Sequence, residues 1–401
     1  MKFGVFYEHQ LPRPWTDGQE HRLLHEALDQ VVLADELGID FAWEVEHHFL
    51  EEYSHSSSPE VFLAAAAART KRIRLGHGIR QVIPNYNHPA RVAEGIATLD
   101  LISNGRVEFG IGEGATRHEI HGFNIAAKQK RALSLEAAEQ IANMMVMTPY
   151  PGFEGRGFSM PCRNVIPKPF QKPHPPMWIA CTNRETIKLA AQLGLGALAF
   201  SFVDPDEARG WAETYYGIVK SDACVPLGHS VNANIAMVSG FSVHDDGDEA
   251  VRRGLEGFQF FGFALQSLVL KPSTPGRTTL WEEFQRLRAA QQLSSITVRG
   301  AAGIGTPAQV QKDLEQFEAA GVDQVIFLQQ AGNNRHEHIC ESLRKFAKDV
   351  MPAFHAREPE REARKQAELA PFIEAALARK KRMPELAEGS IPIIPPIYQP
   401  G

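Results

Sequence analysis

The chain has 401 residues, of which 43% are hydrophobic and 22% charged, and its 42 basic and 48 acidic residues give a formal net charge of −6. These values are ordinary for a globular protein and exclude a disordered or fibrous chain. A net negative charge does not favour binding to nucleic acid or to an acidic membrane surface. We also expect neither a signal peptide nor an apolar run long enough to span a bilayer. We therefore predict a cytoplasmic protein without nucleic-acid or membrane partners.

Strands and helices alternate over the first 111 residues. The pattern predicts strands over residues 2–7, 40–45, 73–79 and 105–111, and helices over residues 20–37, 59–69 and 89–101. Pro59 and Pro89 fit the first turn of their helices. Strand and helix repeating at this spacing indicate right-handed crossovers and a parallel sheet.

The same alternation continues to residue 350. It predicts strands over residues 177–180, 197–202, 231–241 and 324–328, and helices over residues 132–147, 184–193, 206–220, 248–263, 306–320 and 336–350. Eight strands with about eight helices favour a closed (β/α)8 barrel of the TIM type over an open doubly wound sheet.

Three regions depart from the repeat. Proline-rich residues 149–176 predict an inserted hairpin or loop, and residues 268–303 a second insertion that separates the last two units. We assign the barrel to residues 1–352, and residues 353–401 to a charged helix followed by a proline-rich arm, which lies on the barrel or on a partner subunit.

Candidate site residues are sought where strands end, because active sites of eightfold barrels lie there. The second strand ends at Glu46-His47-His48, and successive side chains on a strand point to opposite faces, so the two histidines do not readily share a metal. One of them can face the barrel mouth as an acid, a base or a hydrogen-bond donor. The alternative is a structural histidine, and no metal site is expected.

Two further strand ends offer weaker signals. The fourth ends in GIGEG, which includes Gly112 and Glu113 and allows close approach of backbone to a planar or phosphorylated ligand, but which is not a dinucleotide fingerprint. The fifth leads into Thr182, Asn183, Arg184 and Thr186 at the start of a helix. These residues predict a phosphate-binding site at the helix N-terminus, called the phosphate seat below, which Arg131 could also reach. The alternatives are a tight turn and an ordinary helix cap.

Together these stretches resemble the bacterial luciferase-like flavin monooxygenase family over roughly residues 1–350. The resemblance is carried by the opening MKFGVFYEHQ, FAWEVEHHF, IRLGHGI, NHPARVAEGIATLDLISNGRVEFGIGEG, KRALSLEA, PPMWIACTNRETIKLAAQLGLG and GTPAQVQKDLEQFEAAGVDQVIFL. The family implies a barrel that binds a flavin at the strand C-terminal ends. It implies reduced FMN supplied by a separate reductase, and dioxygen that oxygenates a small organic substrate through a flavin peroxide. Some members use a deazaflavin and transfer a hydride instead.

Residue roles follow from the same resemblance. His47 matches the family's base or proton donor, while His48 faces away. Gly78-Ile79 falls where the family often has a non-prolyl cis peptide beneath the flavin ring. The implied phosphate contacts are Arg131, Asn183 and Thr186, with Thr182 and Arg184 beside them.

Gly112 and Glu113 depart from the family pattern, which has cysteine and arginine at these positions. The missing arginine weakens the phosphate seat unless Arg184 replaces it. Because a carboxylate repels a phosphate, Glu113 is expected to face substrate, flavin ring or a neighbouring arginine.

An apolar pocket is expected from aromatic residues near strand ends, namely Phe6, Trp43, Phe109 and Phe202, unless these belong to the core. The alternative functions are a hydride-transfer oxidoreductase that uses FMN or a deazaflavin, a non-catalytic flavin-binding protein, and a metal-dependent hydrolase. The family and the arm favour a homodimer or a higher homo-oligomer.

Overall fold

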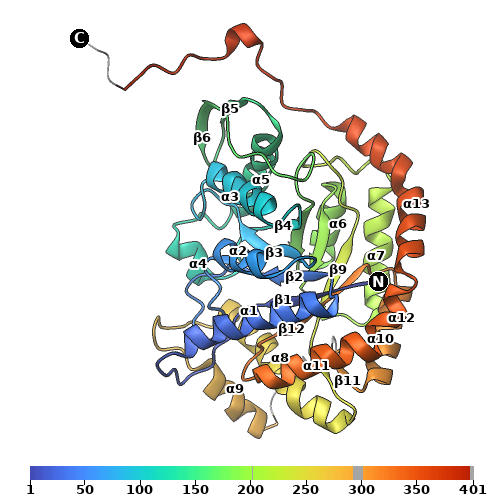
Figure 1. Cartoon of the computed structure of the whole chain (residues 1–401). Helices are drawn as coiled ribbons and strands as arrows, with labels where there is room; N and C mark the ends of the chain where they lie inside the picture. Colours follow the sequence, from blue (N-terminus) through green and yellow to red (C-terminus); the bar gives the residue numbers. More distant parts are fainter. Residues whose placement is uncertain (201, 292–300, 398–401) are drawn as a thin grey trace.

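A closed barrel of eight parallel strands forms the centre of the molecule, and helices surround it (Figure 1). The structure is a computed structural model that describes residues 1–200, 202–291 and 301–397. The barrel is a TIM-type (β/α)8 fold, as the strand count predicts. Its strands follow the order β1 (Lys2–Tyr7), β2 (Phe41–Glu44), β3 (Arg74–Gln81), β4 (Val107–Gly112), β7 (Met177–Cys181), β8 (Gly196–Ala199), β9 (Ile235–Ser239) and β12 (Gln324–Gln329).

The helices between the strands begin at residues that the sequence marks as caps. Asn183, Asp204 and Thr306 each accept the backbone N–H three residues on, and proline follows directly after Asp204 and Thr306. The surrounding helices are α1 (Gln19–Leu37), α2 (Pro59–Arg69), α3 (Pro89–Ile102), α5 (Lys130–Val146), α6 (Arg184–Gln192), α7 (Pro205–Val219), α8 (Gly247–Leu270), α10 (Pro307–Ala319) and α11 (His336–Asp349).

The insertions add short elements outside the barrel. β5 (Tyr150–Glu154) and β6 (Ser159–Arg163) form the antiparallel hairpin expected within residues 149–176. The second insertion contains α9 (Leu280–Ala289), which the sequence pattern did not predict, while residues 292–300 of that insertion lie outside the described residues. The short helix α4 (Arg117–Gly122), which follows β4, was also not predicted.

Two predicted strands need correction. Residues 231–241 do not form one strand, because the side-chain amide of Asn232 donates to Met177 O and the chain leaves the barrel at Gly240. Beyond it β10 (Phe241–Val243) pairs with β11 (Gly303–Gly305) in a separate sheet, where Phe241 packs against Phe327. The strand expected over residues 197–202 is β8, which ends at Ala199, and position 201 lies outside the described residues.

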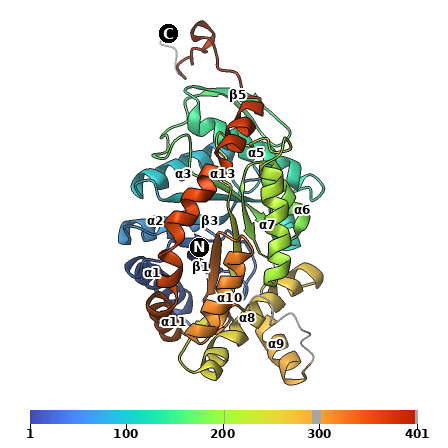
Figure 2. The same cartoon turned by 90° about the vertical axis from the view of Figure 1, so that its right-hand side faces the viewer.

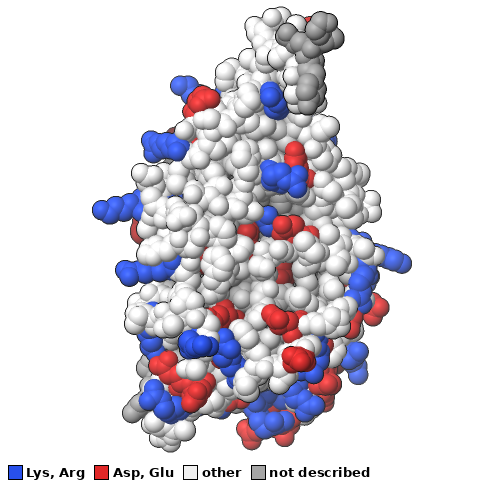
Figure 3. All heavy atoms as spheres, turned by 90° about the vertical axis from the view of Figure 1, so that its left-hand side faces the viewer, with Lys and Arg blue, Asp and Glu red and all other residues white. Residues whose placement is uncertain are grey.

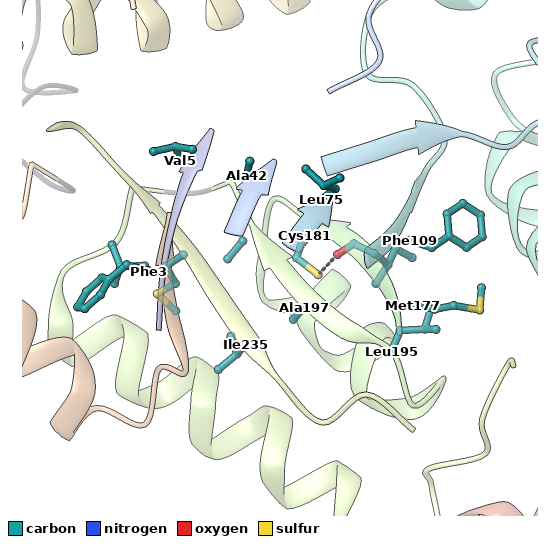
Figure 4. Packing of buried hydrophobic residues seen from close by; sticks show 14 of the residues in the cluster. Phe3, Val5, Ala42, Leu75, Phe109, Met177, Cys181, Leu195, Ala197 and Ile235 are labelled. Atoms are coloured by element: carbon teal, nitrogen blue, oxygen red, sulfur yellow. Dashed lines mark hydrogen bonds between the residues drawn. The ribbon is translucent and has the colours of Figure 1, made fainter. Parts of the chain in front are cut away.

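The main core lies between barrel and helices. Alternate residues of each strand point outward, among them Phe3, Val5, Leu75 and Phe109, and they pack against the surrounding helices (Figure 4). Cys181 belongs to the same layer, and its thiol donates to Ile179 O at 3.5 Å. Each fully buried phenylalanine of this kind stabilises the fold by roughly 1.5–3 kcal/mol.

Two tryptophans fill the inside of the barrel. The indoles of Trp43 and Trp178 meet edge to face with ring centroids 5.3 Å apart. They fit because Gly76 and Gly196 have no side chains: a Cβ at either position would lie within 2.3 Å of an indole carbon. Both indoles are buried, so this layer of side chains is part of the packed core.

The tail begins with α12 (Met351–His355) and α13 (Glu358–Arg379), and α13 lies across the face where the strands begin (Figure 2). Arg361 and Lys365 reach Asp323 at 3.3 and 2.8 Å. The arm beyond α13 carries a single short 3-10 helix over Glu388–Ser390 within residues 380–397, and it extends away from the barrel (Figure 1). Among the described helices of the whole chain, none combines the length and apolarity needed to cross a membrane.

Candidate functional site

The second strand brings one predicted histidine into the barrel mouth. Trp43 and Val45 belong to the cluster inside the barrel, and His47 follows them at the same alternation. Its backbone N–H donates to Ser56 O at 2.8 Å, which holds the turn after β2, and its side chain is 16% exposed. His47 is therefore held in place at the mouth but is still reachable from it.

A buried carboxylate fixes the orientation of the second histidine. Glu46 accepts the backbone N–H of Gln81 and the side-chain amide of Asn87, both at 2.8 Å, and Arg80 Nε lies 3.3 Å away. His48 Nε2 lies 3.1 Å from Glu46 Oε1, so this ring is turned toward Glu46. The two histidines thus face different partners, as strand alternation predicts.

His47 is the centre of a cluster of ionisable side chains. Its Nδ1 lies 2.9 Å from Glu119 Oε1, and its Nε2 lies 3.7 Å from Glu8 Oε2. Tyr53 donates its hydroxyl to Glu8 Oε1 at 3.0 Å, and Thr116 donates its hydroxyl to Glu119 Oε2 at 2.7 Å. Both carboxyl groups are buried, and acidic side chains are visible at the middle of the face where the strands end (Figure 3).

Burial and charge set the protonation of this cluster. Burial lowers the pKa of His47, but the carboxylates of Glu119 and Glu8 outweigh it and raise that pKa to about 9. Burial raises the pKa of Glu8 to about 7, although His47 and the Tyr53 hydroxyl oppose it. Burial would also raise the pKa of Glu119, but the adjacent His47 holds it below its usual value. At neutral pH His47 is therefore protonated, Glu119 is ionised, and Glu8 is close to its midpoint.

The sequence analysis missed both carboxylates of this cluster. Glu8 directly follows the first strand, where strand-end reasoning could have placed it at the mouth. Glu119 lies three residues after Thr116, a spacing typical of a capping box, and Thr116 indeed caps α4. Nothing in the sequence, however, indicates that this short helix turns its glutamate toward His47.

The ends of β3 and β4 are rich in glycine. The Gly78-Ile79 peptide bond is cis, as the family resemblance implies. A Cβ at Gly112 would lie 2.2 Å from Ile79 Cδ1, so the absence of a side chain there makes room for Ile79. Ile79 thus packs directly on the backbone of Gly112, and Trp43 fills the space beside Gly78.

Arg131 is hydrogen-bonded to Glu113, the carboxylate that stands where the family pattern has arginine. Its Nε and Nη2 donate to the two oxygens of Glu113 at 2.9 and 2.8 Å. Lys130 Nζ lies 3.7 Å from the same carboxylate and donates to Gly114 O at 2.7 Å. Burial raises the pKa of the Cys181 thiol at the end of β7 to about 12, and the charge of Arg131 opposes this rise.

The predicted phosphate seat at the start of α6 forms a capping box. Asn183 Oδ1 accepts Thr186 N at 3.1 Å, and Thr186 Oγ1 accepts the backbone N–H groups of Thr182 and Asn183 at 3.1 and 3.2 Å. These N–H groups are therefore not free, contrary to expectation. Arg184 donates to Thr214 Oγ1 at 2.8 Å. The seat borders a hollow of about 580 Å³ whose lining is Thr182, Asn183, Arg184, Phe202, Val203, Asp206, Glu207, Gly210 and Trp211.

The aromatic residues expected at the mouth divide into three groups. Phe6 and Trp43 are buried inside the barrel, whereas Phe109 points outward into the helix layer and lines no mouth. Phe202 packs edge to face on Phe261 of α8, with centroids 5.7 Å apart. An aromatic wall that was not predicted is formed by His48, Phe49, Tyr86 and Phe123, whose rings contact one another.

Comparisons with known proteins find relatives that match most of the chain. The family model described as luciferase-like monooxygenase matches residues 1–324. The oxygenase component of flavin-dependent trigonelline monooxygenase from Acinetobacter baylyi is 25% identical over 361 residues, which cover 88% of this chain and 96% of that protein.

Solved structures show the same fold. Monooxygenase RslO1 from Streptomyces bottropensis superimposes with a TM-score of 0.71 at 28% identity, and the match covers 88% of this chain and all of that one. The oxygenating constituent of 3,6-diketocamphane monooxygenase from Pseudomonas putida, solved with FMN, has a TM-score of 0.67 at 20% identity and covers 88% and 98%. A coenzyme F420-dependent tetrahydromethanopterin reductase from Methanopyrus kandleri has a TM-score of 0.63 at 19% identity and covers 88% and 99%.

Proposed function

The chain belongs to the luciferase-like monooxygenase family, and from that membership we propose that it is a flavin-dependent monooxygenase that uses reduced FMN and dioxygen to oxygenate a small organic substrate. The observation that carries the proposal is the position of His47. This histidine follows β2 at a strand end, is held by Glu119 on Nδ1 and keeps 16% of its side chain exposed. Two proteins at this level of similarity, the trigonelline enzyme and RslO1, are named as monooxygenases.

The residues at the mouth fit a flavin mononucleotide. The ring would lie against Ile79 and Gly112, and the phosphate would lie near Arg131 and the start of α6, with Thr182, Asn183, Arg184 and Thr186 beside it. Glu113 then competes with the phosphate for Arg131, because it already binds the Nε–Nη2 edge of that guanidinium. Reduced FMN supplies the electrons that activate dioxygen, while the protein binds, orients and protonates.

His47 is the proton donor in this proposal. Its pKa of about 9 keeps the imidazole charged at neutral pH, and Glu119 on Nδ1 leaves the Nε2 edge as the one that can serve the mouth. A positioned acid of this kind accelerates a reaction by about 10²–10⁴-fold. The aromatic wall of Phe49, Tyr86 and Phe123 offers an apolar surface for the substrate, because the Phe49 ring is 58% exposed.

A separate reductase is the partner that we propose as the source of reduced FMN. The trigonelline enzyme is named as an oxygenase component, which implies a second component in that system. We also propose that the chain forms a homodimer or a higher oligomer. Its arm exposes apolar side chains that isolated chains rarely leave uncovered, namely Ile391, Ile393, Ile394 and Ile397. Light scattering on the full chain and on residues 1–386 tests this assembly.

Charge reversal at the phosphate seat tests the cofactor site. Arg131→Glu with Arg184→Glu should weaken the binding of reduced FMN by at least about tenfold, because each change replaces an attraction with a repulsion. The matched control reverses two exposed arginines elsewhere, Arg22→Glu with Arg252→Glu, and should leave affinity unchanged. Equal affinity in both double variants would place the phosphate elsewhere.

Hydride transfer with a deazaflavin is the second candidate function. The observation that favours it is the bidentate Glu113–Arg131 pair, which leaves the FMN phosphate less free positive charge than the family pattern provides. A coenzyme F420-dependent reductase also shares the fold. Turnover in the absence of oxygen would support this second function, and a strict requirement for dioxygen would exclude it.

A further inference from the structure

Glu8 is a buried carboxyl group at the mouth for which the proposed function has no role. It follows β1, it is 2% exposed, and its Oε1 accepts the Tyr53 hydroxyl. Its Oε2 is also buried and has no hydrogen-bond partner among the described residues. This oxygen lies 3.7 Å from His47 Nε2, on the side of the imidazole opposite Glu119. A carboxyl with only a structural role would be expected to have both oxygens bonded.

We propose that Glu8 is the proton reserve of the site: it holds a proton on Oε2 and passes it to His47 Nε2 after His47 has released its own. The proton leaves the carboxyl oxygen and binds the imidazole nitrogen, so Glu8 becomes a carboxylate and His47 an imidazolium again. Solvent then reloads Glu8 between turnovers. The use of this proton rests on the proposed function, whereas its presence on Glu8 does not.

The geometry supports direct transfer between the two groups. The two atoms are separated by 3.7 Å, so a shift of about 1 Å brings them into hydrogen-bond range. The Tyr53 hydroxyl holds the other oxygen, and the Tyr53 ring stacks on Phe261 of α8 at 5.7 Å, which limits how Glu8 can turn. The unbonded oxygen is thus kept on the side of the imidazole.

The charges around the pair favour transfer in this direction. Glu8 is surrounded by His47 and Tyr53 from the loop after β2, by Glu44 of β2, by Glu119 of α4 and by the neighbouring His9, whose Nε2 lies 2.7 Å from Glu44. Burial raises its pKa to about 7, and the carboxylates of Glu44 and Glu119 act in the same sense. The pKa of His47 lies higher, at about 9, so a proton on Glu8 moves to an imidazole that has lost its own.

Histidine NMR of the cofactor-free protein tests the proposal without any flavin. In the wild type the His47 ring signal should titrate in two steps, near pH 7 for Glu8 and near pH 9 for its own proton. In Glu8→Gln the lower step should vanish, and the upper step should move down by about one pH unit as a carboxylate is lost. The control Glu94→Gln, a half-buried carboxyl on α3 paired with the exposed Arg91, should keep both steps.

Two outcomes overturn the proposal. One is an unchanged His47 titration in Glu8→Gln. The other, which needs no variant, is an infrared difference spectrum of the wild type in which no buried carboxyl band is lost between pH 6 and 8, the interval around the pKa of about 7. A failure of FMN binding would contradict the proposed function but would leave both measurements unaffected.

The rates of single and multiple turnovers also distinguish a proton reserve from a purely structural residue. In Glu8→Gln a single turnover uses only the proton already on His47 and should be unchanged. Multiple turnovers need that proton restored and should slow about tenfold. Equal slowing of both would show that Glu8 only holds the site in shape, and would overturn its role as a reserve.

Discussion

Buried carboxylates lie at both ends of the barrel, but their partners differ. At the end where the strands begin, Asp323 faces Arg361 and Lys365 of α13. At the mouth, Glu119 and Glu8 lie on opposite sides of His47. Both arrangements remove charge from water, so each needs a counter-charge close by.

The difference lies in what the counter-charge can do. Arginine and lysine keep their protons throughout the physiological range, so the ion pairs of Asp323 can only stabilise the fold. A histidine between two carboxylates can gain and lose its proton, so the charge at the mouth can change during a reaction. The charges at the end where the strands begin are therefore fixed, whereas the charge at the mouth can change with pH.

The largest expected difference between the two ends is the loss of reaction rate when His47 is removed. His47→Gln should slow product formation per folded molecule with reduced FMN and dioxygen by at least about 100-fold, because the proton donor is lost. It should also lower the free energy of unfolding, because the buried Glu119 loses its counter-charge. Product analysis together with urea unfolding measures both. His21→Gln, a surface change on α1, is the control. A rate within threefold or so of wild type would remove His47 from the chemistry.

At the end where the strands begin, we expect a substitution to lower stability and to leave the reaction rate unchanged. Asp323→Asn should lower the free energy of unfolding by roughly 2–3 kcal/mol, because Arg361 and Lys365 lose their counter-charge in a largely buried setting. The folded fraction should keep its rate of product formation. Asp245→Asn, which changes an exposed carboxylate paired with Lys345, should have little effect on urea unfolding. Equal unfolding curves for the two variants would contradict the comparison.

Glu8→Gln is expected to raise the free energy of unfolding at pH 8, by less than Asp323→Asn lowers it. Folding raises the pKa of Glu8 from 4.5 to about 7, so the folded state binds this proton more tightly and stability is lost as pH rises from 4.5 through 7. Glutamine cannot ionise, so at pH 8 the variant should be more stable than wild type by about 1–2 kcal/mol, and below pH 4.5 the difference should disappear. Urea unfolding at the two pH values measures it. A destabilised variant at pH 8 would show that the ionised carboxylate stabilises the fold.

Most of the barrel could be predicted from sequence, because each helix and strand carries its own local signal. Periodicity and the prolines at positions 59, 89 and 307 placed the helix starts within a residue or two. The break at Gly240 was missed, since it depends on β11, which is more than 60 residues away, and α4 is too short to show a periodicity.

The site was predicted only in part, for the same physical reason. His47 follows from strand alternation and from the family resemblance. Its partners Glu8 and Glu119 come from β1 and α4, and only the closed fold brings them within reach of the imidazole. The pairing of Arg131 with Glu113 was left among several alternatives for that carboxylate, because the sequence cannot show which neighbour it faces.

Anaerobic titration with reduced and oxidised FMN, followed by admission of isotope-labelled dioxygen with a panel of aldehydes and ketones, is the most direct measurement of what the mouth does. We predict that reduced FMN binds at least about tenfold more tightly than oxidised FMN, and that the label appears in the product. Turnover that proceeds without dioxygen, or product that carries no label, would contradict oxygenation at this mouth.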